Sequence, residues 1–130
     1  MKKVIIREVD GIGKIIATIG ETIVGHLKYT YPNDASVNPK TYEARNIEID
    51  EVFVNPLFRR NGIGSKMLKF IENKNPVWIS LWTSKEMAEN KSSKFYKSNG
   101  FKEAYYQPDY YEKGIGTTLF VKKVRKCEKD

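Results

Sequence analysis

The hydrophobic pattern changes its period at Gly62, and this change limits the fold more than any other feature of the chain. Before Gly62, apolar residues follow the two-residue alternation or the short continuous runs that are typical of strands. After it, Ile63, Met67 and Ile71 recur at four-residue spacing, which predicts an amphipathic helix. A chain that begins with strands and then mixes strands with helices is expected to form a sheet with helices against it.

Four strands are expected before Gly62. They are Lys3–Val9, Lys14–Ile19, Thr22–Tyr31 and Tyr42–Val54. Short turns separate the first three strands, which predicts two hairpins in series, and the proline- and asparagine-rich segment 32–40 predicts a loop. In the fourth strand, alternation around Ile47 and Ile49 gives way to an apolar run at residues 52–54. This pattern indicates either a strand buried at one end or a bulge.

Helices and strands alternate in the second half. The expected elements are a helix from Gly62 to Asn75, a strand at Val77–Trp82, a helix at Lys85–Ser98 with Ser84 as its N-cap, and strands at Phe101–Tyr106 and Ile115–Val124. The order β-β-β-β-α-β-α-β-β predicts an α/β fold with a mixed sheet and both helices packed on it. No repeat or linker interrupts the sequence, so we expect residues 1–130 to form one domain.

Composition excludes several function classes. One cysteine and one histidine in 130 residues exclude a disulfide framework and a Cys/His metal cluster, so we expect no metal. No apolar run approaches the roughly 20 residues of a membrane span, and we expect a cytoplasmic protein with no membrane partner. The 23 basic and 16 acidic residues give a formal charge of +7. A basic surface attracts nucleic acid, but it equally attracts a phosphate-bearing cofactor.

A candidate anion site lies where the fourth strand meets the first helix, in the segment from Val54 to Ser65. The first amides of a helix have no internal partner, and the helix dipole places partial positive charge there. Glycines let a phosphate approach those amides, and Arg59 and Arg60 add full charges. The segment lacks the third glycine of the dinucleotide fingerprint, and no Gly-Lys-Ser/Thr phosphate loop is present. We therefore expect a pyrophosphate site of another kind.

Two signatures resemble those of the GNAT superfamily of N-acetyltransferases. Arg59-x-x-Gly62-x-Gly64, which follows a strand ending in Val-x-Val-x-Pro, is similar to the acetyl-CoA pyrophosphate motif of that family. The segment Phe95-Tyr96-Lys-Ser-Asn-Gly-Phe resembles the second family signature, and the two occur in the family order with one strand between them. The resemblance implies a mostly antiparallel mixed sheet and transfer of an acetyl group from acetyl-CoA to a primary amine.

The resemblance also implies roles for matching positions. Backbone groups around Val52 and Val54 would pair with the pantetheine arm, and Tyr96 would protonate the leaving thiolate. The implied cofactor-binding residues are Val52, Phe53, Val54, Arg59, Arg60, Asn61, Gly62, Ile63, Gly64 and Ser65, with Asn90 and Ser92 as further candidates. Many relatives have an asparagine seven residues before the tyrosine; here Glu89 holds that place and Asn90 follows it, and Ser92 stands where alanine is usual.

Acetyl transfer to an amine also needs a base, because an ammonium group is not a nucleophile. Glu48 lies six residues before Val54, where the histone-acetylating branch of the family has a strand glutamate. Strict alternation places Glu48 on the same face as Val52 and Val54 unless a bulge intervenes. Glu48 fits a solvated edge residue equally well, and Asp50, Glu51 or a water molecule are the alternatives as base.

The acceptor side is expected to be open. Relatives carry one or two helices between the first two strands, whereas here only residues 10–13 join them. We therefore expect the first hairpins either to form a homodimer or to receive a macromolecular acceptor, with Ile5, Ile15, Ile23 and Tyr29 as candidate contacts. The sequence does not decide between a small amine and a protein lysine or N-terminus.

The remaining aromatic residues have expected structural roles. Trp78 and Trp82 are expected in the core or in a pocket wall, and Tyr105–Tyr111 in a loop over a substrate site. Two other functions stay open. One is a non-catalytic acyl-CoA-binding module on the same fold. The other is a small basic nucleic-acid-binding protein, which would bind with a steep salt dependence.

Overall fold

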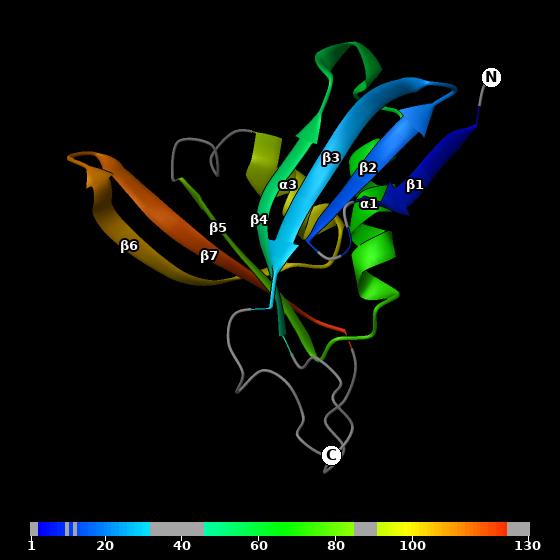
Figure 1. The fold of residues 1–130 in the computed structure, drawn as a ribbon. Coiled ribbons are helices and arrows are strands. Elements are labelled where there is room, and N and C mark those ends of the chain that lie inside the picture. Colours follow the sequence, from blue (N-terminus) through cyan, green and yellow to red (C-terminus); the bar gives the residue numbers. More distant parts are fainter. Residues whose placement is uncertain (1–2, 10, 12, 32–45, 85–90, 125–130) are drawn as a thin grey trace.

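In a computed structural model, residues 3–9, 11, 13–31, 46–84 and 91–124 are described. Their elements in chain order are β1 (Val4–Glu8), β2 (Lys14–Ile19), β3 (Thr22–Thr30), β4 (Asn46–Val54), the 3-10 turn η2 (Pro56–Phe58), α1 (Ile63–Glu72), β5 (Trp78–Ser84), α3 (Lys91–Ser98), β6 (Lys102–Glu112) and β7 (Ile115–Lys123). The strands form one seven-stranded sheet in the order β1-β2-β3-β4-β5-β7-β6 (Figure 1). Among these described strands, only β4 and β5 pair in parallel. The predicted mixed, mostly antiparallel sheet is confirmed.

The order of strands and helices agrees with the sequence prediction, and the main difference lies in β6. The predicted strand ends at Tyr106, but β6 continues to Glu112 because its antiparallel pairing with β7 continues past two register irregularities. The predicted loop at Tyr105–Tyr111 is therefore wrong. Ser84, predicted as an N-cap, is the last residue of β5. The predicted loop at 32–40 and the first turns of the helix predicted from Lys85 lie outside the described residues.

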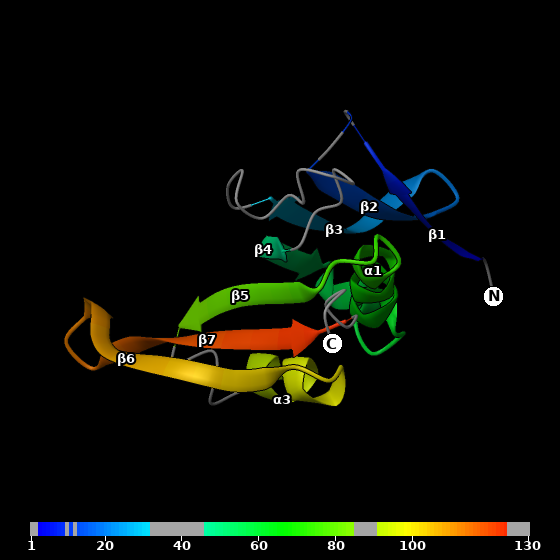
Figure 2. The ribbon, with the colours of Figure 1, turned by 90° about the horizontal axis from the view of Figure 1, so that it is seen from below.

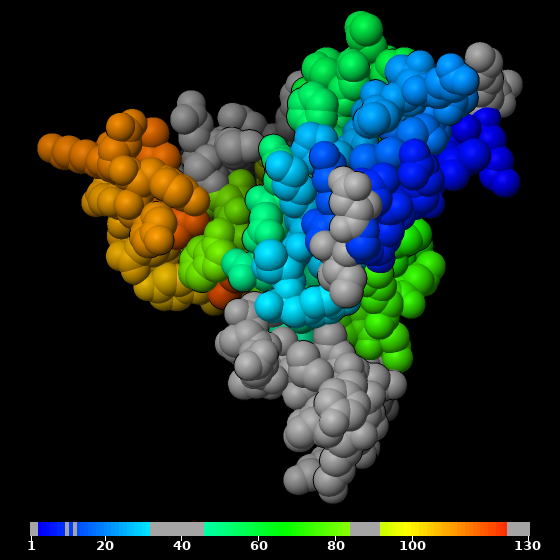
Figure 3. Space-filling view, in the orientation of Figure 1, coloured from blue at the N-terminus to red at the C-terminus, as the bar shows by residue number. Residues whose placement is uncertain are grey.

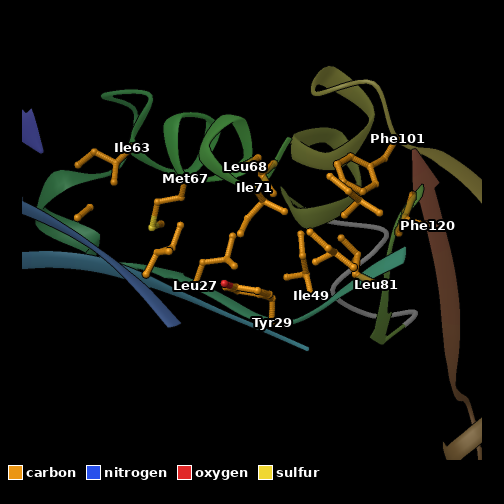
Figure 4. Packing of buried hydrophobic residues seen from close by; sticks show 14 of the residues in the cluster. Leu27, Tyr29, Ile49, Ile63, Met67, Leu68, Ile71, Leu81, Phe101 and Phe120 are labelled. Atoms are coloured by element: carbon orange, nitrogen blue, oxygen red, sulfur yellow. The ribbon is translucent and has the colours of Figure 1, made fainter. Parts of the chain in front are cut away.

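Both described helices lie on the same side of the sheet (Figure 2). Leu27, Tyr29 and Ile49 project from the strands toward Met67, Leu68 and Ile71 of α1, as Figure 4 shows. Leu81, Phe101 and Phe120 extend this core toward α3. Four residues were offered as partner contacts, some of which had to face the core. Ile15 and Tyr29 are buried there, whereas Ile5 and Ile23 are exposed. Neither described helix is long and apolar enough to cross a membrane.

Figure 3 shows the opposite face of the sheet, where the strands lie at the surface with no described helix over them. Its exposed apolar residues include Ile5, Ile23, Phe53, Trp78 and Trp82. The two tryptophans are therefore outside the core, and the alternative that they line a pocket wall stays a prediction. Because residues alternate between faces of a strand, Ile79 and Leu81 point to the core and the flanking tryptophans point to this uncovered face.

Candidate active site

On one side, strand β4 pairs with β3 from Glu48 to Val54. On the other side, pairing with β5 joins Asn46–Ile49 to Trp78–Leu81 and extends no further among the described residues. The register with β3 shifts so that Lys28 faces Glu51 and Tyr29 faces Ile49, which makes Asp50 the extra residue of a bulge. A bulge bends its strand and increases the local twist. Beyond Ile49, β4 and β5 therefore diverge (Figure 1), and we call this divergence the splay.

The splay leaves backbone groups of β4 without a strand partner. Asn55 donates its N–H to the carbonyl of Val24 on β3 at 2.8 Å. Since antiparallel residues alternate in the direction of their hydrogen bonds, Phe53 also points its backbone toward β3, whereas Val52 and Val54 point theirs into the splay. The Val54 carbonyl accepts from Nε of Arg59 at 3.1 Å. An extended ligand arm can add to Val52 and to the Val54 N–H in the manner of a further strand.

A loop at the upper end of the splay leads from β4 into α1. Asn55 opens η2 by accepting the N–H of Leu57 at 3.0 Å, and Asn61 donates to the carbonyl of Phe58 at 3.2 Å. Arg60 and Gly62 adopt left-handed backbone conformations, with φ of 68° and 74°. These two reversals turn the chain sharply at the point where the helix begins.

The N-terminus of α1 has the features of an anion site. Gly62 is its N-cap, so no side chain bonds the first helical amides, and no acidic residue occupies the first turn. The N–H groups of Ile63, Gly64 and Ser65 therefore lack an intrahelical partner. Arg59 and Arg60 are exposed just before them. Free amides, the helix dipole and two guanidinium groups together favour a bound phosphate.

The two glycines of the loop have different surroundings. A Cβ atom on Gly62 would meet nothing within 4 Å, so this position is open. A Cβ atom on Gly64 would lie 2.8 Å from Cζ of Phe95 on α3. The sequence predicts that a phosphate approaches Gly64. In the structure, the ring of Phe95 fills the space that a side chain at this position would need. Gly64 is thus a packing glycine whose contact holds α3 against the beginning of α1.

We expect Gly64→Ala to lower the free energy of unfolding by about 1–2 kcal/mol, although alanine favours helices more than glycine does. The added methyl group must displace the ring of Phe95. Chemical denaturation measures the change, and Ser65→Ala, at the exposed next position, serves as the matched control. A Gly64→Ala variant as stable as this control would show that the contact with Phe95 is loose.

Tyr96 follows Phe95 and packs into the same region. Its ring centroid lies 5.7 Å from those of Phe101 and Phe120. Burial raises the pKa of the Tyr96 phenol above its ordinary value, so the group is protonated at neutral pH. Its hydroxyl forms no hydrogen bond with a described residue. A protonated hydroxyl without such a partner is suited to donate a proton.

The bulge separates Glu48 from the face on which strict alternation places it. Ile47 and Ile49 are buried in the core, and Val52 and Val54 pack against that same core. The bulge that the sequence left open is present at Asp50, so Glu48 shares the uncovered face with Glu51 and Phe53. Glu48 lies beside Thr30 of β3 and Ser80 of β5.

The three neighbouring carboxyl groups of β4 differ in their surroundings. Glu51 lies 3.0 Å from Nε2 of His26 and 3.6 Å from Nζ of Lys28; the hydrogen bond with His26, and to a smaller extent both charges, lower the pKa of Glu51. Partial burial raises the pKa of Asp50, although a hydrogen bond from Thr30 opposes this. Glu48 forms no ion pair with a described residue. Glu51 is therefore held in contacts with His26 and Lys28, whereas Glu48 and Asp50 remain candidates for the base.

The structure brings most of the sequence candidates together and leaves some apart. Residues 52–54 line the splay, and residues 59–65 form the loop above it. Phe53 stacks on His26 with a centroid distance of 5.5 Å on the uncovered face. Ser92 is half-buried near the beginning of α3, and Asn90 lies outside the described residues. The contact between Phe95 and Gly64 has no local sequence signal, because 31 positions separate the two residues.

Comparisons with known proteins agree with this arrangement. The family model of the acetyltransferase (GNAT) domain matches residues 4–103. A putative GNAT acetyltransferase from Desulfovibrio desulfuricans superposes with a TM-score of 0.72 at 18% identity, covering 87% of this chain and 70% of its own.

Two further solved structures have the same fold. The ribosomal-protein-S18-alanine N-acetyltransferase from Escherichia coli gives a TM-score of 0.71 at 15% identity, with 95% and 76% of the two chains covered. An aminoglycoside 6'-N-acetyltransferase complexed with coenzyme A gives 0.71 at 13% identity, with 88% and 73% covered. No curated protein matches the sequence significantly.

Proposed function

The chain belongs to the GNAT acetyltransferase family, and from this membership we propose that it transfers the acetyl group of acetyl-CoA to a primary amine by direct attack in a ternary complex. The observation that carries the proposal is the junction between the unpaired edge of β4 and the uncapped N-terminus of α1. One side of this junction suits an extended amide-bearing arm and the other suits a pyrophosphate. Acetyl-CoA contains both groups in sequence.

In this proposal, Val52 and Val54 bind the pantetheine arm through their backbone groups. The N–H groups from Ile63 to Ser65 and the side chains of Arg59 and Arg60 bind the pyrophosphate. The known relatives support this use of the fold, since one of them was solved with coenzyme A. Two of them are named for acetylating amines, namely an aminoglycoside and the alanine of a ribosomal protein.

The chemistry requires one proton to leave the amine and one to reach the sulfur. Glu48 accepts the amine proton directly or through water, with Asp50 as the alternative base. The neutral amine forms a C–N bond to the thioester carbon, the C–S bond breaks, and Tyr96 gives its proton to the departing thiolate. The raised pKa of Tyr96 supports its role as the donor. Cys127 lies outside the described residues in a charged terminal segment, so we propose no acyl-enzyme intermediate.

Initial rates of thiol release, measured while acetyl-CoA and an amine are both varied, test this function. A ternary complex gives intersecting reciprocal plots, whereas an acyl-enzyme gives parallel lines. Binding of acetyl-CoA without thiol release for a panel of amines would favour a non-catalytic binding module. Salt-sensitive binding of oligonucleotides without affinity for acetyl-CoA would favour a nucleic-acid-binding protein.

We further propose that residues 1–130 act as one domain, in the cytoplasm, and that the first hairpins, residues 3–31, join two copies of the chain through their part of the uncovered face. Ile5 and Ile23 are exposed on that face and support a homodimer. Sedimentation at micromolar concentration should give twice the chain mass. A monomer at all concentrations would contradict the homodimer but not the proposed reaction.

A further inference from the structure

The surroundings of Glu48 on the uncovered face are aromatic. Ser80 is its direct neighbour on β5, and Trp78 and Trp82 lie two residues before and after Ser80 on the same face. Beyond Trp82, the sheet register leads across Leu119 to Tyr105 on β6. A carboxylate thus lies between two tryptophans, and a tyrosine lies beyond the second of them.

Trp82 and Tyr105 form an exposed aromatic pair. Their ring centroids are 6.3 Å apart at an interplanar angle of 83°, and the residues are 45% and 50% exposed. An edge-to-face pair at this exposure leaves ring surface accessible to solvent. Such ring surface attracts cations, because the faces of aromatic rings carry negative potential.

The same face already shows one contact of this kind. Nζ of Lys123 lies 5.8 Å from the ring centroid of Trp78. Trp78 therefore has a cation from within the chain, whereas no cation–π contact to Trp82 or Tyr105 occurs among the described residues. Glu48 is likewise without an ion pair among them. A carboxylate without an ion pair and accessible aromatic rings thus lie near Ser80 on the same face of the sheet.

We propose that the acceptor is a diamine-like cation: its reacting amine lies at Glu48 and a second, fixed positive charge lies against Trp82 and Tyr105. This inference rests on the proposed function, since it specifies the substrate class of the same site. The charge complementarity supports it, because the reacting amine must become neutral and only the second charge remains to be bound. The whole chain has a formal charge of +7, which repels cations. The attraction for a cation therefore comes from the groups at this site and not from the net charge.

Sheet geometry gives the separation of the two charges. Neighbouring strands lie about 4.8 Å apart and residues two apart on a strand about 6.7 Å apart, so the Cα atoms of Glu48 and Trp82 are about 8 Å apart. With carbon–carbon bonds of about 1.5 Å, a spacer of roughly four to six methylene groups covers this distance. Shorter diamines place both charges at Glu48, and longer ones extend past Tyr105.

The test compares 1,5-diaminopentane with pentylamine, which has the same chain and lacks the second charge. We expect kcat/KM for acetylation to be about tenfold higher for the diamine, mainly through a lower KM, and to fall for 1,2-diaminoethane. Trp82→Leu should lower kcat/KM for the diamine about fivefold and leave pentylamine and the Kd of acetyl-CoA unchanged. Trp78→Leu is the matched control, because Lys123 already lies over its ring, and it should preserve the preference for the diamine.

The outcomes separate this inference from the proposed function. Equal kcat/KM for the two amines, or a preference for the diamine that stays near tenfold in Trp82→Leu, would overturn the inference and leave the acetyltransferase proposal intact. If neither amine is acetylated while a lysine-bearing peptide is, the small-diamine class is wrong but the reaction stands. If no amine of any kind is acetylated, both proposals are wrong.

Discussion

Replacing Tyr96 with phenylalanine is expected to lower kcat for acetyl transfer by about 10²–10⁴-fold, which is the usual contribution of a general acid. The substitution removes one hydroxyl and keeps the ring in its contacts with Phe101 and Phe120. The free energy of unfolding and the Kd of acetyl-CoA should therefore stay close to the wild-type values. Single-turnover rates at saturating acetyl-CoA measure the effect.

A matched control for this variant is Tyr110→Phe, which removes a hydroxyl from an exposed tyrosine of β6. It should leave kcat unchanged. Because the pKa of Tyr96 lies above the ordinary value of 10.0, this group is protonated throughout the neutral range and loses its proton only above that value. The rate of the wild-type protein should therefore not decline through Tyr96 between pH 7 and 9. A wild-type rate for Tyr96→Phe would show that another group protonates the thiolate.

The second large effect is expected at Gly62, where an added side chain meets open space. Gly62→Asp should weaken acetyl-CoA binding by about 30-fold or more relative to Gly62→Asn, because it places a negative charge beside the pyrophosphate. Asparagine and aspartate both tolerate the left-handed conformation of this residue, so backbone strain affects the two variants alike.

Calorimetric titration of both variants with acetyl-CoA measures this difference. It should decrease as salt is added, since the repulsion acts at an exposed position. Equal affinities of Gly62→Asp and Gly62→Asn for acetyl-CoA would show that the pyrophosphate does not bind at the beginning of α1. Circular dichroism is the control for folding, and both variants should keep the wild-type helix content.

Much of the fold could be predicted because local periodicity reports which face of an element is buried. The four-residue spacing of Ile63, Met67 and Ile71 identified α1, and all three are buried against the sheet. The strand–loop–helix segment of the candidate anion site could be predicted too, since it depends on a local feature, a strand that enters a helix through a basic, glycine-containing loop. These features lie within one segment of about twelve residues.

Features set by contacts between distant segments were missed. The packing role of Gly64 was missed because nothing nearby in sequence indicates Phe95, 31 positions later. The sequence pattern offered a bulge in β4 only as one of two alternatives, because the register with β3 determines it, so the face of Glu48 stayed undecided. The sequence left Trp78 and Trp82 either in the core or in a pocket wall. They are exposed because no described helix covers their face of the sheet.

The central claim is that acetyl-CoA lies along β4 from the splay to the N-terminus of α1. Backbone amide chemical shifts of the isotope-labelled chain, followed while acetyl-CoA is added, test it most directly. The account predicts that the largest changes occur at Val52, Val54 and residues 62–65, with small changes on β1 and β2. Saturable binding whose largest shifts fall elsewhere, or no binding at millimolar acetyl-CoA, would contradict it.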